Sequence, residues 1–64
     1  MNVPTVGGIP VRVGETYYAV RGDVPRRVVD VLLNGTVIVQ NLSGGREWAV
    51  RRFSYNYYRK SERQ

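Results

Sequence analysis

The sequence predicts a small all-β protein, and three observations lead to that fold class. Two valine-rich runs, 26–33 and 36–42, are separated only by an Asn-Gly dipeptide, which is typical of a β-hairpin. Clusters of turn-forming residues recur between short runs rich in β-branched and aromatic residues. The chain has 64 residues, enough for one domain only. Five short strands with tight turns then indicate a small barrel or a pair of packed sheets.

The N-terminal part is expected to contain an arm and then a strand. Residues 1–10 hold two prolines and a Gly-Gly pair, and because glycine loosens the backbone and proline lacks a donor, we expect a flexible arm. The valine- and tyrosine-rich segment 11–20 favours a strand that begins near Thr16. Residues 21–25, Arg-Gly-Asp-Val-Pro, are turn formers and mark a connection, so the Arg-Gly-Asp tripeptide is interpreted as turn chemistry.

The hairpin centred on Asn34-Gly35 is the clearest local signal. A two-residue turn of the mirror-image type needs positive φ at both positions, which asparagine tolerates and glycine adopts freely. This turn places three pairs opposite one another: Leu33 with Thr36, Val31 with Ile38, and Val29 with Gln40. One expected face then contains Val29, Val31, Leu33, Ile38 and Leu42, and the other contains Val28, Leu32, Val37 and Val39. A hairpin with two apolar faces must be covered twice, by its own chain or by a partner, so the first face is a possible dimer face.

The C-terminal part is expected to complete the fold. Residues 46–53 predict a third strand of a meander, although its register depends on whether the preceding glycine loop has two or three residues. A C-terminal helix competes with this interpretation, because Ala49, Phe53 and Tyr57 follow i, i+4 spacing. A short 3₁₀ turn over 54–57 is expected before a last strand at 57–60, and residues 61–64 are expected to be a disordered tail.

The composition excludes several function classes. Without cysteine or histidine, the usual zinc and iron–sulfur sites and cysteine- and histidine-based catalysis are excluded, which leaves five carboxylates, five tyrosines and scattered hydroxyls. We therefore expect no metal, no cofactor and no enzymatic activity. No stretch approaches the roughly 20 apolar residues that span a bilayer, and the first residues do not resemble a secretory signal. We therefore expect a cytoplasmic protein with no membrane contact.

The positive charge is concentrated in the last third of the chain. The protein carries a formal net charge of +5. Residues 1–45 hold four arginines against three acidic residues, a net of +1, whereas residues 46–64 hold six basic residues against two acidic ones, a net of +4. The same third contains five of the seven aromatic residues, which makes it the main candidate for a binding surface.

The order of segments resembles a known architecture. The runs Val11-Arg12-Val13-Gly14-Glu15-Thr16-Tyr17-Tyr18, Arg27-Val28-Val29-Asp30-Val31-Leu32-Leu33, Thr36-Val37-Ile38-Val39-Gln40-Asn41 and Trp48-Ala49-Val50-Arg51-Arg52-Phe53 are similar to SH3-like barrels of the Tudor and KOW kind, and more distantly to the C-terminal domain of retroviral integrases. The resemblance implies an SH3-like five-stranded barrel over residues 11–60. It also implies a module that binds RNA, DNA, modified side chains or other proteins.

Two functions are compatible with these features. The first is non-catalytic binding of DNA or RNA, in which arginines meet phosphates and tyrosines stack on bases. The candidate residues are Arg46, Arg51, Arg52, Tyr55, Tyr57, Tyr58, Arg59 and Lys60, with Arg26 and Arg27 as a secondary basic pair, whereas Trp48 and Phe53 are assigned to the core. The alternative is a protein-interaction or dimerisation module, such as a phage- or plasmid-type accessory or inhibitor protein, that docks on an acidic protein surface or on a second copy through the apolar hairpin.

Overall fold

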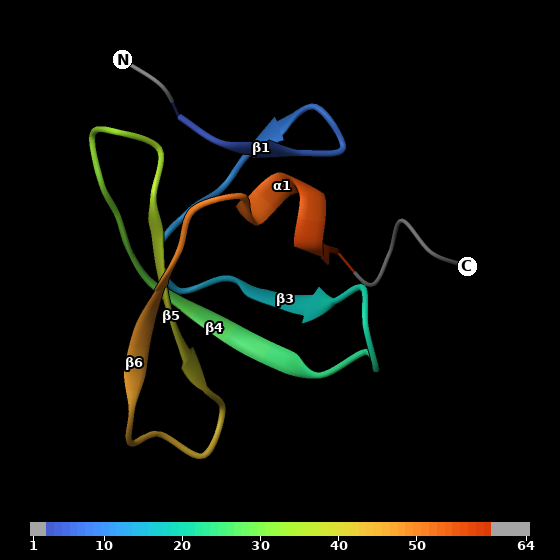
Figure 1. The fold of residues 1–64 in the computed structure, drawn as a ribbon, viewed down its shortest axis with the longest axis vertical. Helices are drawn as coiled ribbons and strands as arrows, with labels where there is room; N and C mark the ends of the chain where they lie inside the picture. Colours follow the sequence, from blue (N-terminus) through green and yellow to red (C-terminus); the bar gives the residue numbers. More distant parts are fainter. Residues whose placement is uncertain (1–2, 60–64) are drawn as a thin grey trace.

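The computed structural model describes residues 3–59, which form seven short strands and one helical turn (Figure 1). The strands are β1 (Thr5–Val6), β2 (Ile9–Pro10), β3 (Thr16–Ala19), β4 (Pro25–Val31), β5 (Val37–Asn41), β6 (Glu47–Val50) and β7 (Tyr57–Tyr58), and helix α1 (Phe53–Asn56) precedes β7. The prediction of an all-β fold is confirmed. The expected tail and Lys60 lie outside the described residues.

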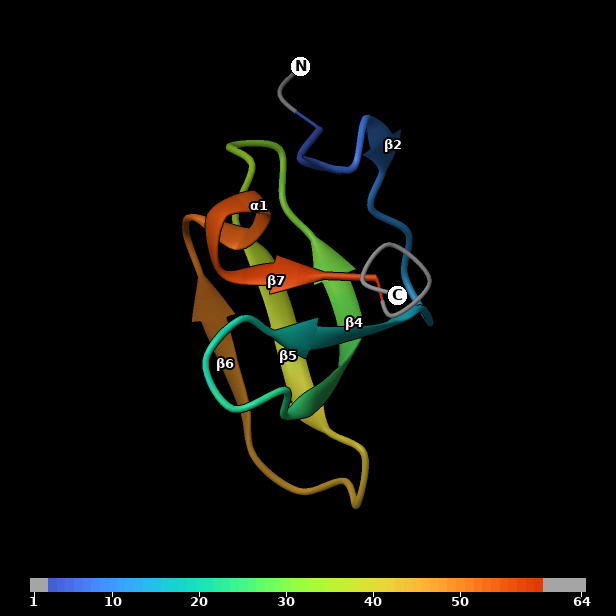
Figure 2. The same ribbon diagram turned by 90° about the vertical axis from the view of Figure 1, so that its right-hand side faces the viewer.

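Five of the strands form one antiparallel sheet in the order β6-β5-β4-β3-β7, and β1 pairs with β2 in a separate sheet. Figure 2 shows β3 and β7 side by side, crossing in front of β4 and β5, with α1 leading into β7. Within residues 3–59 neither sheet is closed into a barrel. The structure therefore supports the predicted fold at the level of a small all-β protein.

The β4–β5 hairpin is present, but its turn differs from the prediction. The Leu32 amide donates to the Thr36 carbonyl at 2.8 Å, and the Gly35 amide donates to the Leu32 carbonyl at 3.0 Å. The loop therefore has three residues, 33–35, instead of two. Gly35 has a φ of 89°, whereas Asn34 is not among the described residues with positive φ. This is the geometry of a type I turn followed by a left-handed glycine.

The longer loop changes the register of the hairpin. Val31 lies opposite Val37 rather than Ile38, and the ladder shifts again between Val28 and Asp30, where Val29 forms a β-bulge. As a result the inward side chains are Val28, Val31, Val37 and Val39, and the outward positions include Arg27, Asp30, Ile38 and Gln40. The expected pair of apolar faces is therefore wrong, because a bulge moves every residue beyond it to the other side of the sheet.

The core consists of five valines and three aromatic rings. Its buried members are Val6, Val11, Tyr17, Val28, Val37, Val39, Phe53 and Tyr57. The Phe53 ring meets Tyr17 edge to face with centroids 5.0 Å apart, and it stacks on Tyr57 at 4.6 Å, two arrangements that the ring quadrupole favours. The assignment of Phe53 to the core is confirmed, and Trp48 is partly buried against the same cluster.

The C-terminal elements settle the alternatives left open by the sequence. Trp48 in β6 lies opposite Val39, so its side chain is on the core side of the sheet. The competing C-terminal helix is limited to the single turn α1, whose last hydrogen bond runs from the Tyr57 amide to the Phe53 carbonyl. The expected helical turn before the last strand is thus confirmed, with α rather than 3₁₀ bonding. Among the described residues no helix is long or apolar enough to cross a membrane.

The N-terminal segment is more ordered than its glycines and prolines suggest. Strands β1 and β2 form a small hairpin, and the side chain of Val6 is only 4% exposed. The Val11 amide donates to the Pro4 carbonyl at 3.0 Å, and the Ser54 hydroxyl of α1 donates to the Thr5 carbonyl. Residues 3–10 therefore differ from the expected arm, because contacts with distant parts of the chain define their conformation.

Candidate nucleic-acid interface

Four of the predicted contact residues are exposed on the surface. Arg51 and Arg52 lie in the connection from β6 to α1, and Tyr55 on α1 is 79% exposed. Arg46 is also exposed but precedes β6. Because β6 has four residues at about 3.4 Å each, Arg46 is separated from Arg51 by roughly the length of that strand. Arg51, Arg52 and Tyr55 thus lie on one short stretch of backbone, in which the Tyr55 amide donates to the Arg52 carbonyl at 3.1 Å, and Arg46 lies at the other end of β6.

The two following tyrosines have internal roles. Tyr57 is 9% exposed, and one face of its ring stacks on Phe53. The Tyr58 hydroxyl donates to the Asp23 carboxylate, and its ring packs at a tilt against Tyr18 with centroids 6.1 Å apart. Neither ring is as exposed as that of Tyr55, so the structure does not bring the three tyrosines into one stacking surface.

Arg59 is bound inside the protein. Its side chain is 15% exposed. One terminal nitrogen donates to the Val6 carbonyl, and the other donates to the Tyr17 hydroxyl at 2.7 Å and to the Pro10 carbonyl at 3.1 Å. The same nitrogen lies 3.5 Å from a carboxylate oxygen of Glu15. We therefore correct the predicted role of Arg59: this guanidinium joins the N-terminal hairpin to β3 and is not displayed for phosphate binding.

The groups around Arg59 are electrostatically coupled. The pKa of Glu15 is lowered from 4.5, mainly because the Tyr17 hydroxyl donates to its carboxylate, with smaller contributions from the Arg12 amide and the Arg59 charge. The pKa of Tyr17 is raised well above 10.0, first by burial and second by its hydrogen bond to Glu15. Both pKa shifts favour the same protonation state of the folded protein, in which Glu15 is ionised and Tyr17 is neutral.

Arg26 and Arg27, the secondary basic pair, lie in different environments. The guanidinium carbon of Arg26 lies 4.9 Å from the centre of the Trp48 ring, a cation–π contact. Its buried Nε atom has no hydrogen-bond partner in the described part of the chain. Arg27, the next residue, is on the outer side of β4 and is exposed. Arg27 can therefore contact a ligand directly, whereas Arg26 would first have to leave the Trp48 ring.

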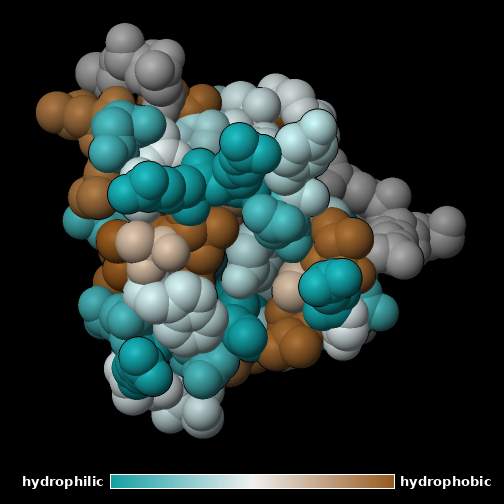
Figure 3. All heavy atoms as spheres, in the orientation of Figure 1, coloured by the Kyte–Doolittle hydropathy of each residue, from teal (hydrophilic) through white to brown (hydrophobic). Residues whose placement is uncertain are grey.

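The exposed charge of residues 3–59 is net positive, with six exposed arginines against three exposed acidic residues. Across residues 3–59, Arg59–Glu15 is the one ion pair found. Six arginines are exposed and form no ion pair within this range, namely Arg12, Arg21, Arg27, Arg46, Arg51 and Arg52. Hydrophilic and hydrophobic residues are interspersed on the face seen in Figure 3, without one continuous apolar area. This distribution suits an anionic partner better than an apolar one.

The register of the β4–β5 hairpin separates the residues of the predicted dimer face. Val31 packs against the core, whereas Leu33 in the β4–β5 turn is 79% exposed. Val29 and Ile38 are partly exposed, and Leu42 lies in the next loop. The five residues therefore do not form the continuous strand face that was expected.

A hollow that the sequence analysis did not find lies beside α1. It has a volume of about 410 Å³ and is lined by Ala19, Val20, Arg21, Tyr55, Asn56 and Tyr57. It arises where the end of β3 and the following loop meet α1 and β7, segments more than thirty residues apart in sequence. The only signal in the sequence was the cluster of turn formers at 21–25, which indicates a loop but does not indicate that this loop packs beside α1.

Comparison with protein-family models, with curated proteins and with solved structures gave no match to this chain.

Proposed function

We propose that this protein is a non-catalytic nucleic-acid-binding module built on an SH3-like arrangement of strands. Support for the architecture comes from the order of the main sheet: four consecutive strands, β3 to β6, are neighbours, and β7 returns through one helical turn to pair with β3. The marked crossing of β3 and β7 over β4 and β5 (Figure 2) is the curvature that such a small barrel requires.

The observation that carries the proposal is the set of exposed arginines without carboxylate partners. An arginine that already pairs with a carboxylate must lose that pairing to bind phosphate, whereas the six exposed arginines of residues 3–59 have no such pairing to lose. The planar guanidinium matches a phosphate with two donors. Arg51, Arg52 and Tyr55 add two exposed cations and an exposed ring within five residues of the chain, a combination that suits a backbone and an unpaired base.

An electrophoretic mobility titration tests this proposal, with single- and double-stranded DNA and RNA at two salt concentrations. Binding that depends on phosphate contacts should weaken by roughly tenfold or more between about 50 and 200 mM salt, because each neutralised phosphate releases counterions. The double variant Arg51→Glu/Arg52→Glu should bind more weakly than the wild type and show a shallower salt dependence.

A charge-matched control separates a local contact from a general effect of net charge. Arg12→Glu changes the net charge as much as Arg52→Glu does, at an exposed arginine between β2 and β3. Arg52→Glu should weaken binding more than Arg12→Glu. No binding at low salt, or binding that is insensitive to salt, would contradict the proposed function.

The alternative function, self-association through the hairpin, has a narrower basis in the structure. The favouring observation is the exposure of Leu33 and the partial exposure of Ile38. Light scattering at high protein concentration distinguishes the two functions. A stable dimer that dissociates in the Ile38→Asp variant would favour the alternative, and a monomer that binds nucleic acid would favour the first.

A further inference from the structure

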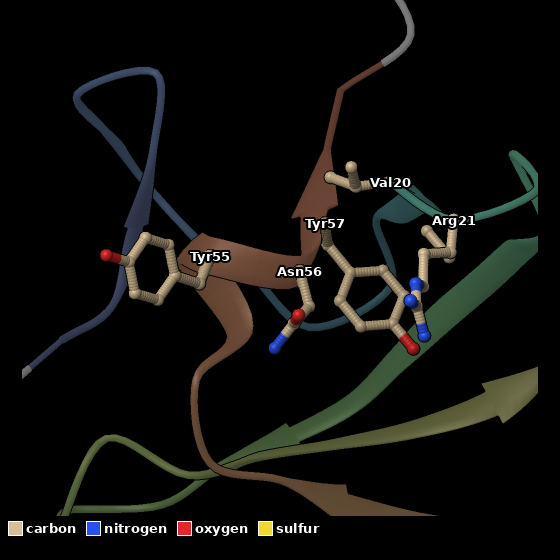
Figure 4. Close-up of a pocket in the computed structure, with 6 residues that line it drawn as sticks. Val20, Arg21, Tyr55, Asn56 and Tyr57 are labelled. Atoms are coloured by element: carbon tan, nitrogen blue, oxygen red, sulfur yellow. The ribbon is translucent and has the colours of Figure 1, made fainter.

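The hollow beside α1 places an arginine and a tyrosine hydroxyl in one cavity. Arg21 comes from the loop after β3, whereas Asn56 and Tyr57 come from the end of α1 and the start of β7. In Figure 4 the side chains of Arg21 and Tyr57 extend to the same side of the hollow, and the ring of Tyr55 extends away on the other side of α1. The polar ends of Arg21 and Tyr57 therefore lie together at one side of the hollow, whereas Tyr55 contributes to its lining from the other side of α1.

Both polar groups have unused donors. The Arg21 side chain is exposed and forms no ion pair within residues 3–59. The Tyr57 ring is held by its stacking on Phe53, but no hydrogen bond of its hydroxyl is found among the described residues, and this oxygen is not among their buried unpaired atoms. The hydroxyl of an otherwise buried side chain is therefore open to the hollow and can donate to a ligand.

The backbone around the hollow is held in place on both sides. The Val20 amide donates to the Asn56 carbonyl at 2.9 Å, which ties the loop to α1 directly. Within the loop, the Asp23 amide donates to the Ala19 carbonyl at 3.0 Å, and Gly22 and Asp23 adopt positive φ values of 82° and 54°. A tightly turned loop with these bonds presents Arg21 from a defined backbone position, which reduces the entropy lost when a ligand binds.

The size and charge of the hollow indicate its ligand. Its volume of about 410 Å³ falls within the range of roughly 300–1,000 Å³ that is usual for ligand pockets. Its lining includes one cation and no acidic residue. The nearest acid in the loop sequence is Asp23, whose carboxylate accepts a hydrogen bond from the Tyr58 hydroxyl. A guanidinium and a phenolic hydroxyl together suit an oxyanion, since both donate and neither must lose an internal partner.

We propose that this hollow binds one backbone phosphate of the nucleic acid, with the Arg21 guanidinium pairing with the phosphate and the Tyr57 hydroxyl donating a hydrogen bond to it. This inference rests on the proposed function and assigns a specific site within it. It also extends the binding surface beyond the C-terminal third, to the loop that connects β3 with β4.

Two substitutions test the two donors separately, with the same titration in single-stranded and double-stranded DNA and RNA. Arg21→Gln should weaken binding roughly tenfold and reduce the salt slope by about one, because one phosphate contact is lost. Tyr57→Phe retains the ring and its stacking but removes the hydroxyl, so it should weaken binding by about three- to tenfold without a change in salt slope.

Each substitution has a matched control. Ser43→Ala removes a hydroxyl from an exposed position in the loop between β5 and β6, which does not line the hollow, so the affinity should remain that of the wild type. Arg12→Gln removes an exposed arginine elsewhere and should weaken binding less than Arg21→Gln. Thermal unfolding of every variant should match the wild type, since none of the four substitutions removes a buried contact that the structure shows.

Amide chemical shifts provide an independent readout. A titration with a short single-stranded oligonucleotide should shift the amides of residues 20–22 and 56–57 in the wild type and should shift them less in Tyr57→Phe. If Arg21→Gln and Tyr57→Phe bind as the wild type does while Arg51→Glu/Arg52→Glu loses binding, the phosphate site is refuted and the proposed function stands. If the wild type binds no nucleic acid, both are refuted.

Discussion

Arg59 shows how one residue can be misassigned when only its type and neighbours in sequence are known. It lies in a basic, aromatic segment, yet it contacts Tyr17, Glu15 and the carbonyls of the N-terminal hairpin. A guanidinium has five donors in a fixed plane, and few other side chains can join several carbonyls and a hydroxyl at once. In a 64-residue protein without cysteine, such a group adds contacts between the N-terminal hairpin and β3 to those of a small apolar core.

The coupling of Glu15 to Tyr17 and Arg59 predicts a loss of stability in acid. The folded-state pKa of Glu15 is lowered from 4.5, so its contribution to the free energy of unfolding is fully present above that pH. The contribution is lost as the pH falls through the lowered folded-state value. Urea denaturation from pH 6 to pH 2.5 measures it, and Glu15→Gln should show a smaller decrease over this range. An identical pH dependence in both proteins would contradict the coupling.

At the scale of elements, the β4–β5 hairpin shows how a correct motif can have an incorrect register. The Asn-Gly dipeptide was correctly identified as a turn, but Asn34 is a central residue of a type I turn and Gly35 alone is left-handed. The Asn34 side chain accepts a hydrogen bond from the Thr36 amide at 3.0 Å, which stabilises this form. One additional loop residue and the bulge at Val29 then decide which valines enter the core.

Asn34→Gly distinguishes the two turn types. In a two-residue mirror-image turn both central positions need positive φ, so glycine there should be neutral or stabilising. In the observed turn the substitution removes the bond to the Thr36 amide and adds backbone freedom, so it should cost about 0.5–1.5 kcal/mol. Chemical denaturation gives the difference, with Leu33→Ala at an exposed loop position as the control. A stabilised Asn34→Gly variant would contradict the three-residue loop.

At the scale of the whole molecule, the N-terminal hairpin is part of the folded unit. Val6 and Val11 join the core cluster, and Ser54 and Arg59 donate hydrogen bonds to carbonyls of residues 5–10. Residues 5–11 therefore contribute to the same core as the main sheet. Its exposed arginines are distributed over several elements, with Arg21 and Arg27 outside the C-terminal third, so a ligand surface need not coincide with the most basic part of the sequence.

Two substitutions in this hairpin should have very different costs. Val6→Ala removes two methyl groups from a side chain that is 4% exposed and should lower the free energy of unfolding by about 1–3 kcal/mol. Ile9→Ala affects a side chain that is 55% exposed and should cost less than about 0.5 kcal/mol. Thermal or urea unfolding measures both. Equal small effects would indicate that the hairpin does not pack on the core in solution.

The sequence was sufficient to predict the all-β class, the strand that begins at Thr16, the hairpin near Asn34-Gly35 and the helical turn before the last strand. These features depend on local propensity and turn chemistry, which act within a few residues. It also determined that Phe53 belongs to the core, since a large ring in so small a protein has few other places to be buried.

Four features became visible only in three dimensions: the register of the hairpin, the packing of residues 3–10, the internal contacts of Arg59 and the hollow lined by Arg21 and Tyr57. Each depends on contacts between segments far apart in the chain, such as the bond from the Val20 amide to the Asn56 carbonyl. Such contacts leave no periodic or local pattern in the sequence, because the groups that meet are brought together by the path of the whole backbone.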